Sequence, residues 1–152
     1  MRRAKLGALI IGAVIIAPAV GLVGLAGAAT GTAGTATLNH QTLVLTHWSV
    51  VAGSFTANGY VTGDPSGSSA TVKSTTVTTD GTGFLVTNTV VKVTVSTATH
   101  HTTLTCKVLV TNQLHLKLVS GNYTGTVTVP ASQYTGACGS PSTGDATVTL
   151  KP

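Results

Sequence analysis

Five histidines, three aspartates and two cysteines are the side chains with which this sequence could bind a metal ion or catalyse a reaction. Acid–base catalysis by carboxylates needs two Asp or Glu side chains that converge on one bond. The chain has no glutamate, and its aspartates, Asp64, Asp80 and Asp145, each lie beside a glycine in a predicted turn. Turns favour Asp because its carboxylate accepts hydrogen bonds from nearby backbone N–H groups. We therefore interpret all three as turn residues and expect no glycosidase chemistry.

A serine or cysteine nucleophile is not indicated either. The chain contains no G-x-S-x-G sequence, and the pattern lacks the strand–turn–helix setting in which such a serine is exposed. Two cysteines that pair with each other would leave no thiol for catalysis. The sequence thus predicts a protein that is not an enzyme and that needs no cofactor.

The histidines are the residues with the most potential as metal ligands. His100 and His101 are adjacent, so their side chains would point to opposite faces of a strand but could converge in a loop. A blue-copper site is not indicated, because no Met follows Met1 and no His lies close after Cys106. We expect solvated histidines at strand edges, with His100 and His101 kept as candidates for a Zn or Cu site. The remaining histidines lie on predicted strands: His40, His47 and His115.

Cys106 and Cys138 are the only two cysteines. An even number of cysteines in an exported chain is typical of a disulfide, and two cysteines this far apart make a poor metal signature. We predict a Cys106–Cys138 disulfide, which would stabilise the fold by ~3–4 kcal/mol in the chain-entropy model. The alternatives are two buried free thiols or a metal pair.

The chain has only six aromatic residues, so most of them are expected to pack in the core or at a corner of the fold. Trp48 and Tyr60 are the candidates for a shallow ligand-binding surface, as in sugar-binding modules. The competing interpretation is that both residues pack in the core or at a corner.

The elements that must position these residues are strands. Thr and Val dominate the chain beyond residue 29, and both are branched at Cβ, which suits strands better than helices. Apolar and polar residues alternate, with no helical i, i+3, i+4, i+7 spacing. Seven to nine short strands separated by turns predict an all-β fold, an antiparallel β-sandwich of the Ig-like, Greek-key type.

Three local features of this pattern are specific enough to test. Asn58-Gly59 lies between β-forming residues, which predicts a hairpin turn at that dipeptide. Phe84–Thr97 is expected as one long strand, with a β-bulge where the alternation changes parity at Val90-Val91. His47 is expected on the same face of its strand as Leu45.

One run resembles a known class of proteins. Gly121–Val129 (GNYTGTVTV) is similar to the G-x-Y-x-G-x-V-x-V run near the end of many bacterial surface and pilin-type Ig-like sandwiches. The resemblance covers nine residues of one strand. It implies an Ig-like architecture in which Tyr123 pins a corner of the fold, as in a tyrosine corner, and it implies no functional residues.

Residues 1–29 have the three parts of a secretion signal. A cationic start is followed by the apolar run Leu6–Ala29, which ends in small residues that fit cleavage after Ala28 or Ala29. The signal would form a helix before it is removed. The alternative is an uncleaved membrane anchor, since about 20 apolar residues can span a bilayer. Pro18 interrupts the run and favours the cleaved signal.

The rest of the chain is one domain in size. We expect residues 30–35 to form a flexible leader and residues 36–152 to form a single β-sandwich domain. Without residues 1–29, five lysines against three aspartates give a net charge of +2. The lysines are isolated along the sequence and no Arg accompanies them, so nucleic acid is not an expected partner.

These observations favour a secreted, non-enzymatic β-sandwich that acts as a structural or adhesion-type module at the cell surface. Its partner would be a cell-wall or surface glycan or protein, and a membrane only if the N-terminal segment is retained. One alternative is a β-barrel or pore-forming subunit of a cell envelope, because barrel strands also alternate. A second alternative is a small extracellular protein that binds a metal or other ligand through its histidines.

Overall fold

The computed structural model describes residues 28–97 and 102–152. Within these ranges the chain is almost entirely β-strand, with a single 3-10 turn and no α-helix, so the all-β prediction is confirmed. The elements are β1 (Ala28–Gly31), β2 (Ala33–Leu38), β3 (Gln41–Val51), β4 (Ser54–Val61), β5 (Ser68–Ser74), β6 (Thr76–Thr79), β7 (Gly83–Thr87), β8 (Thr89–Ser96), β9 (Thr103–Val110), β10 (Leu114–Val119), β11 (Asn122–Val129), η3 (Ala131–Gln133), β12 (Tyr134–Gly136) and β13 (Gly144–Lys151).

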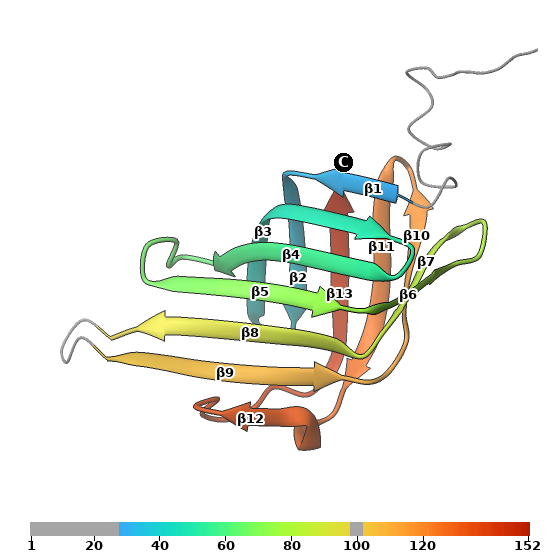
Figure 1. The fold of residues 1–152 in the computed structure, drawn as a ribbon. Coiled ribbons are helices and arrows are strands. Elements are labelled where there is room, and N and C mark those ends of the chain that lie inside the picture. Colours follow the sequence, from blue (N-terminus) through green and yellow to red (C-terminus); the bar gives the residue numbers. More distant parts are fainter. Residues whose placement is uncertain (1–27, 98–101) are drawn as a thin grey trace, which may run out of the picture.

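The strands form one continuous antiparallel sheet rather than the two separate sheets of a sandwich. Its order is β12-β9-β8-β5-β4-β3-β2-β13-β11-β10-β7-β6, and β1 adds to β3. The expected seven to nine strands were therefore too few, because the sheet has 13. The sheet curls so that a front layer (β1, β3, β4, β5, β8, β9 and β12) crosses a back layer (β2, β13, β11, β10, β7 and β6), as Figure 1 shows.

β3 belongs to both layers because it bends. It lies beside β2 in its first half and enters the front layer in its second half (Figure 1), with a register shift against β4 between Leu45 and His47. The extra residue changes the parity of the strand, so Leu45 and Trp48 point inward while His47 is exposed. The prediction that His47 shares a face with Leu45 was wrong for this reason.

Asn58-Gly59 lies inside β4 and is not a hairpin turn, which corrects the sequence-based prediction. A Cβ at Gly59 would overlap the backbone carbonyl of Val44 on the neighbouring strand. Glycine is therefore needed here for a close backbone approach where the sheet bends, and not for a turn.

The segment Phe84–Thr97 is two strands that lie in different layers. β7 ends at Thr87 and β8 begins at Thr89, and between them Asn88 adopts a positive φ of 52°. The predicted parity change exists, but Asn88 causes it and no bulge occurs at Val90-Val91. Asn is one of the few residues other than Gly that adopts this conformation readily.

The chain also passes from one layer to the other at Ser74, between β5 and β6. A hydrogen bond from Ser74 to Thr87 joins this crossing to the one at Asn88. The buried Ser74 hydroxyl donates to the Thr87 carbonyl at 2.5 Å and accepts from the Thr76 N–H at 3.0 Å. The edge strand β6 of the back layer is also bonded to the front layer, because the Gly53 N–H donates to the Val77 carbonyl at 2.8 Å. These bonds hold the two layers together at one side.

The core lies between the layers on that side. Tyr123 from β11 contacts Trp48 edge-on, with ring centroids 6.1 Å apart, and Phe84 at 5.5 Å. Tyr123 does lie at the start of its strand, but its buried hydroxyl has no hydrogen-bond partner in the part of the chain that the structure describes. It therefore does not make the hydrogen bond of a tyrosine corner.

The N-terminal part of the described chain is built into the sheet. Ala28–Gly31 pairs with β3, Ala29 is buried in the core, and residues 33–38 pair with β3 and β13. Within residues 30–35 all but Thr32 lie in strands, so the flexible leader that we expected is not formed. Most of the predicted signal helix lies outside the described residues. No helix in the described ranges is long and apolar enough to cross a membrane.

Candidate functional site

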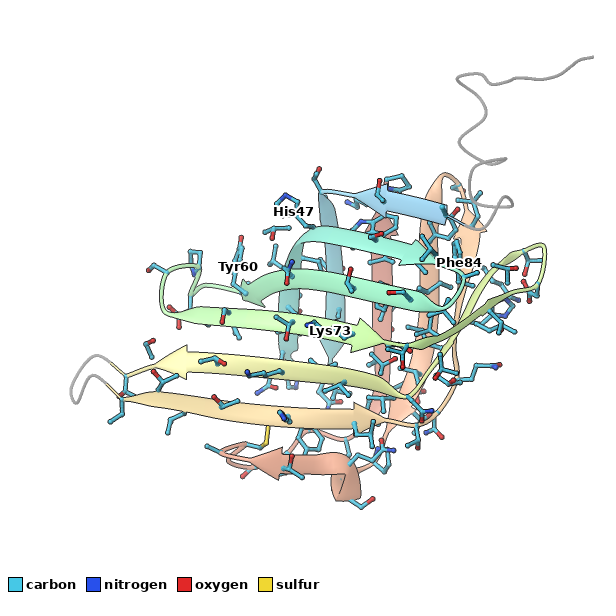
Figure 2. All side chains as sticks on the ribbon, viewed as in Figure 1. His47, Tyr60, Lys73 and Phe84 are labelled. Carbon is cyan, nitrogen blue, oxygen red and sulfur yellow. A yellow bond between two sulfur atoms is a disulfide. The ribbon has the colours of Figure 1, made fainter. Side chains whose placement is uncertain are left out.

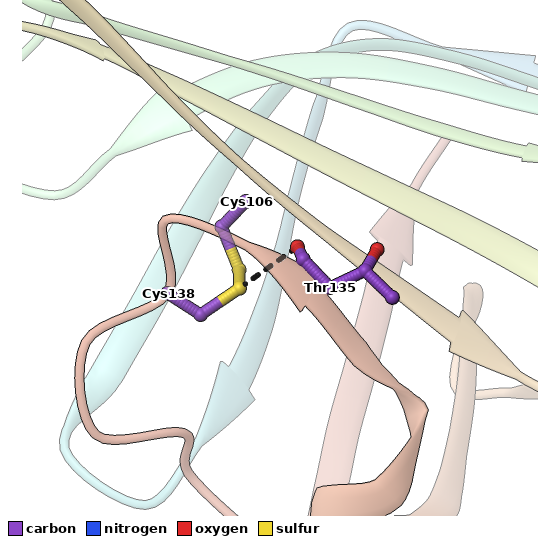
Figure 3. The surroundings of a disulfide bond; sticks show 3 residues. All are labelled: Cys106, Thr135 and Cys138. Atoms are coloured by element: carbon purple, nitrogen blue, oxygen red, sulfur yellow. Dashed lines mark hydrogen bonds between the residues drawn. A yellow bond between two sulfur atoms is a disulfide. The ribbon is translucent and has the colours of Figure 1, made fainter.

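The predicted disulfide is present and anchors the segment that follows β12. Cys106 on β9 bonds to Cys138, 32 residues later. The Cys138 sulfur lies 3.1 Å from the Thr135 carbonyl oxygen, the contact dashed in Figure 3. An oxidised sulfur has no hydrogen to donate, so this contact adds little. The covalent bond and a backbone hydrogen bond of 2.9 Å from the Ala137 N–H to the Thr105 carbonyl attach this segment to the front layer.

A cavity of about 370 Å³ lies between the two layers. Its walls are the inward faces of strands from both layers, together with the segment that Cys138 anchors. The apolar lining residues are Ala36, Leu38, Leu43, Leu45, Phe55, Val61, Val72, Val91, Val93, Val95, Val108, Val110, Leu114, Val127, Val129, Tyr134, Ala137, Pro141, Ala146 and Val148, together with the disulfide.

The cavity has a closed inner end and an open outer end. Leu45 and Phe55, at the inner end, are almost fully buried in the main core. Val91, Val93 and Val95 on β8 are only half-buried, so these side chains line the cavity where it is accessible from outside. The strand alternation places all three on one face.

The lining contains no charged side chain. Thr37 and Thr42 bond to each other through their hydroxyl groups at 3.0 Å, which satisfies polar atoms in the wall. The exposed Gln41 and the half-buried Ser142 supply polar groups at its edge. Burial raises the pKa of the Tyr134 hydroxyl, which therefore stays protonated and neutral. The interior thus offers hydrocarbon contact, and the edge offers a few hydrogen bonds.

The histidines do not form a metal site in the described part of the chain. His100 and His101 lie outside the described residues. His40 and His47 are exposed on different parts of the surface. No group of three His, Cys, Asp or Glu side chains comes together within residues 28–97 and 102–152.

His115 is the one histidine here with an acidic partner. Its Nε2 lies 3.0 Å from Asp80 Oδ2 and 3.1 Å from Thr82 Oγ1. The Thr82 hydroxyl donates to Asp80 Oδ1 at 2.7 Å, and the Thr82 N–H donates to the same oxygen. These bonds from Thr82 hold the Asp80 pKa below its ordinary value.

This cluster cannot work as a catalytic triad. A triad needs the carboxylate on one imidazole nitrogen and the nucleophile on the other. Here the carboxylate and the hydroxyl both contact Nε2, so no proton can pass through the His115 ring. The cluster closes the turn between β6 and β7, which agrees with the interpretation of Asp80 as a turn residue.

Trp48 and Tyr60 do not form a common surface. Trp48 is 3% exposed, points inward, and donates from its indole Nε1 to the Ala33 carbonyl at 3.0 Å. Tyr60 lies on β4 with its side chain on the outer face of the sheet, as Figure 2 shows. Trp48 is therefore a core residue, and the candidate binding surface made from these two aromatics is not formed.

The sequence pattern alone did not point to the cavity. It identified the inward faces of several strands correctly, but the space between those faces depends on how far the layers diverge. The chain matches no family model, no curated protein and no solved structure.

Proposed function

We propose that this chain is an exported, non-enzymatic protein that binds a small apolar molecule between the layers of its sheet. The cavity carries the proposal. Ligand pockets commonly have volumes of ~300–1,000 Å³, apolar walls and a few polar groups that orient the ligand. The cavity between the layers has a volume of about 370 Å³ and the same kind of lining.

The binding energy would come from release of water. A water molecule takes ~30 Å³ of liquid volume, so the cavity holds roughly a dozen waters. Hydrocarbon walls give these waters few hydrogen bonds, and an apolar ligand that displaces them gains affinity. The expected ligand has a hydrocarbon body for the interior and at most a small polar group near Gln41 and Ser142.

Two further observations support export without catalysis. A disulfide is favoured in an oxidising compartment outside the cytoplasm, and the N-terminal sequence has the pattern of a secretion signal. The only Asp–His–Thr cluster in the described residues has the wrong geometry for proton transfer. Hydrolysis of an ester, peptide or glycan panel at enzyme-like rates would contradict the non-enzymatic part of the proposal.

Binding of a neutral fluorescent naphthylamine, N-phenyl-1-naphthylamine, tests the cavity directly. We expect its emission to rise with saturation on the purified protein. Val93→Phe places a larger side chain inside the cavity and should weaken binding at least tenfold. Val44→Phe is the matched control, because Val44 is also half-buried but lies on the outer face and does not line the cavity.

Urea unfolding of both variants checks that they are folded. If the native protein does not bind the dye, or if the two variants weaken binding equally, the cavity is not the binding site and the proposal is wrong.

The surface-module interpretation from the sequence is the second candidate function. It is supported by the outer face of the front layer, where Thr56, Lys73, Lys92 and Lys107 are exposed. A surface or adhesion role needs this face to bind a partner.

A further inference from the structure

Three lysines that are far apart in the sequence meet on one face of the sheet. Lys73 on β5, Lys92 on β8 and Lys107 on β9 are exposed on the outer face of three adjacent strands. Lys92 and Lys107 are direct cross-strand partners. Figure 2 labels Lys73 on this face. We call the surface formed by these lysines, Val90 and Leu109 the basic face.

The basic face has no acidic partner. The sequence contains three aspartates, and each is bonded elsewhere: Asp64 to the Gly67 N–H, Asp80 to Thr82, and Asp145 to the Thr128 hydroxyl. The hollow between the lysines is lined by Ser, Thr and Val side chains and by no carboxylate. Like charges directly opposite each other on neighbouring strands are destabilising, so an external anion beside the Lys92–Lys107 pair would reduce their repulsion.

Two exposed apolar side chains adjoin these lysines. Val90 is 38% exposed, Leu109 is 43% exposed, and the two are cross-strand partners. Val90 is also the cross-strand partner of Lys73. The basic face therefore combines positive charge with a small apolar area in adjacent rows of the same sheet.

We propose that the basic face docks onto an anionic lipid surface. A soluble polyanion would need the charges alone, whereas a lipid headgroup layer can take both the charges and the shallow apolar side chains. This inference is independent of the cavity, which lies on the opposite side of the same strands. One lysine near an anionic membrane contributes ~1 kcal/mol, which corresponds to about fivefold in partitioning.

The test measures sedimentation with vesicles of phosphatidylglycerol and phosphatidylcholine, and with phosphatidylcholine alone, using the full chain. We expect stronger binding to the anionic vesicles than to phosphatidylcholine alone, and weaker binding as salt screens the charges. Lys92→Gln/Lys107→Gln should reduce partitioning about 25-fold, since two fivefold effects are lost. Lys117→Gln/Lys151→Gln on the back layer removes the same charge and should change it less than threefold.

A second pair of variants tests the apolar side chains. Val90→Thr/Leu109→Thr should reduce partitioning several-fold, while Val119→Thr, an exposed valine on β10 in the back layer, should not. The N-terminal segment is the same in all variants, so the ratios between variants report on the basic face alone. Circular dichroism confirms that each variant is folded.

Three results would overturn the proposal. The first is equal loss of vesicle binding in both lysine double variants. The second is no loss in Val90→Thr/Leu109→Thr. The third is lysine-dependent binding of soluble polyphosphate without binding to anionic vesicles, which would identify a polyanion as the partner instead.

Discussion

Replacement of Tyr123 by phenylalanine should stabilise the protein. The Tyr123 side chain is 1% exposed, and its hydroxyl is buried without a hydrogen-bond partner in the described part of the chain. In the unfolded chain the same hydroxyl bonds to water. Phenylalanine keeps the ring, and therefore keeps the contacts with Trp48 and Phe84, but it removes the atom that loses hydration on folding.

The magnitude follows from the cost of an unsatisfied buried group. Such a group costs ~1–3 kcal/mol in the native protein. The small gap left by the missing oxygen destabilises the variant and offsets part of the gain. We expect Tyr123→Phe to raise the free energy of unfolding by about 1 kcal/mol. For a domain of this size the melting temperature should rise by roughly 3–5 °C.

Urea unfolding followed by tryptophan fluorescence measures this change, because Trp48 is the only tryptophan and contacts Tyr123. Tyr60→Phe is the control, since Tyr60 is half-buried on the outer face and should give a change within about 0.5 kcal/mol. A loss of 1 kcal/mol or more in Tyr123→Phe would refute the reasoning. That result would mean that the hydroxyl has a hydrogen-bond partner, as in a tyrosine corner.

Two other predictions concern the disulfide and the turn between β6 and β7. The double variant Cys106→Ala/Cys138→Ala should lose ~3–4 kcal/mol in urea unfolding, because the bond closes a loop with a sequence separation of 32 residues; a loss below about 1 kcal/mol would show that loop closure contributes little. Asp80 has a lowered pKa, so its stabilising effect is present above its ordinary pKa of 3.8 and is lost as pH falls through the lower pKa of the folded state. Asp80→Asn should therefore lower the melting temperature at pH 7 but not at strongly acidic pH, and an equal difference at both pH values would contradict this.

Strand character and the disulfide could be predicted from the sequence because both depend on local or compositional signals. On β11 the alternation of Tyr123, Val127 and Val129 with threonines gives the buried face correctly. In the turn between β10 and β11, Ser120 and Gly121 both adopt positive φ.

The predictions failed where long-range pairing overrides a local preference. Asn58-Gly59 has the composition of a turn, but Gly59 is required by the backbone of Val44 on a neighbouring strand. The alternation near Val90 showed that the chain changes face, but only the conformation of Asn88 shows that it changes layer.

The cavity and the basic face could not be predicted from sequence patterns, for the same reason. Lys73, Lys92 and Lys107 look isolated along the chain, and the pairing of β5, β8 and β9 brings them together. The volume between the layers depends on the bend in β3 and on the disulfide that holds residues 137–142. Neither the strand order nor the bend is encoded in any single segment.

The position of β13 has a consequence for when the molecule can fold. This last strand lies between β2 and β11, so it separates two groups of strands that would otherwise share no backbone hydrogen bonds along the sheet. Its pairing with β2 joins residues more than a hundred positions apart, such as Ala36 and Val148, and contacts of that length slow folding. The nascent chain therefore cannot complete its sheet until Gly144–Lys151 has been synthesised.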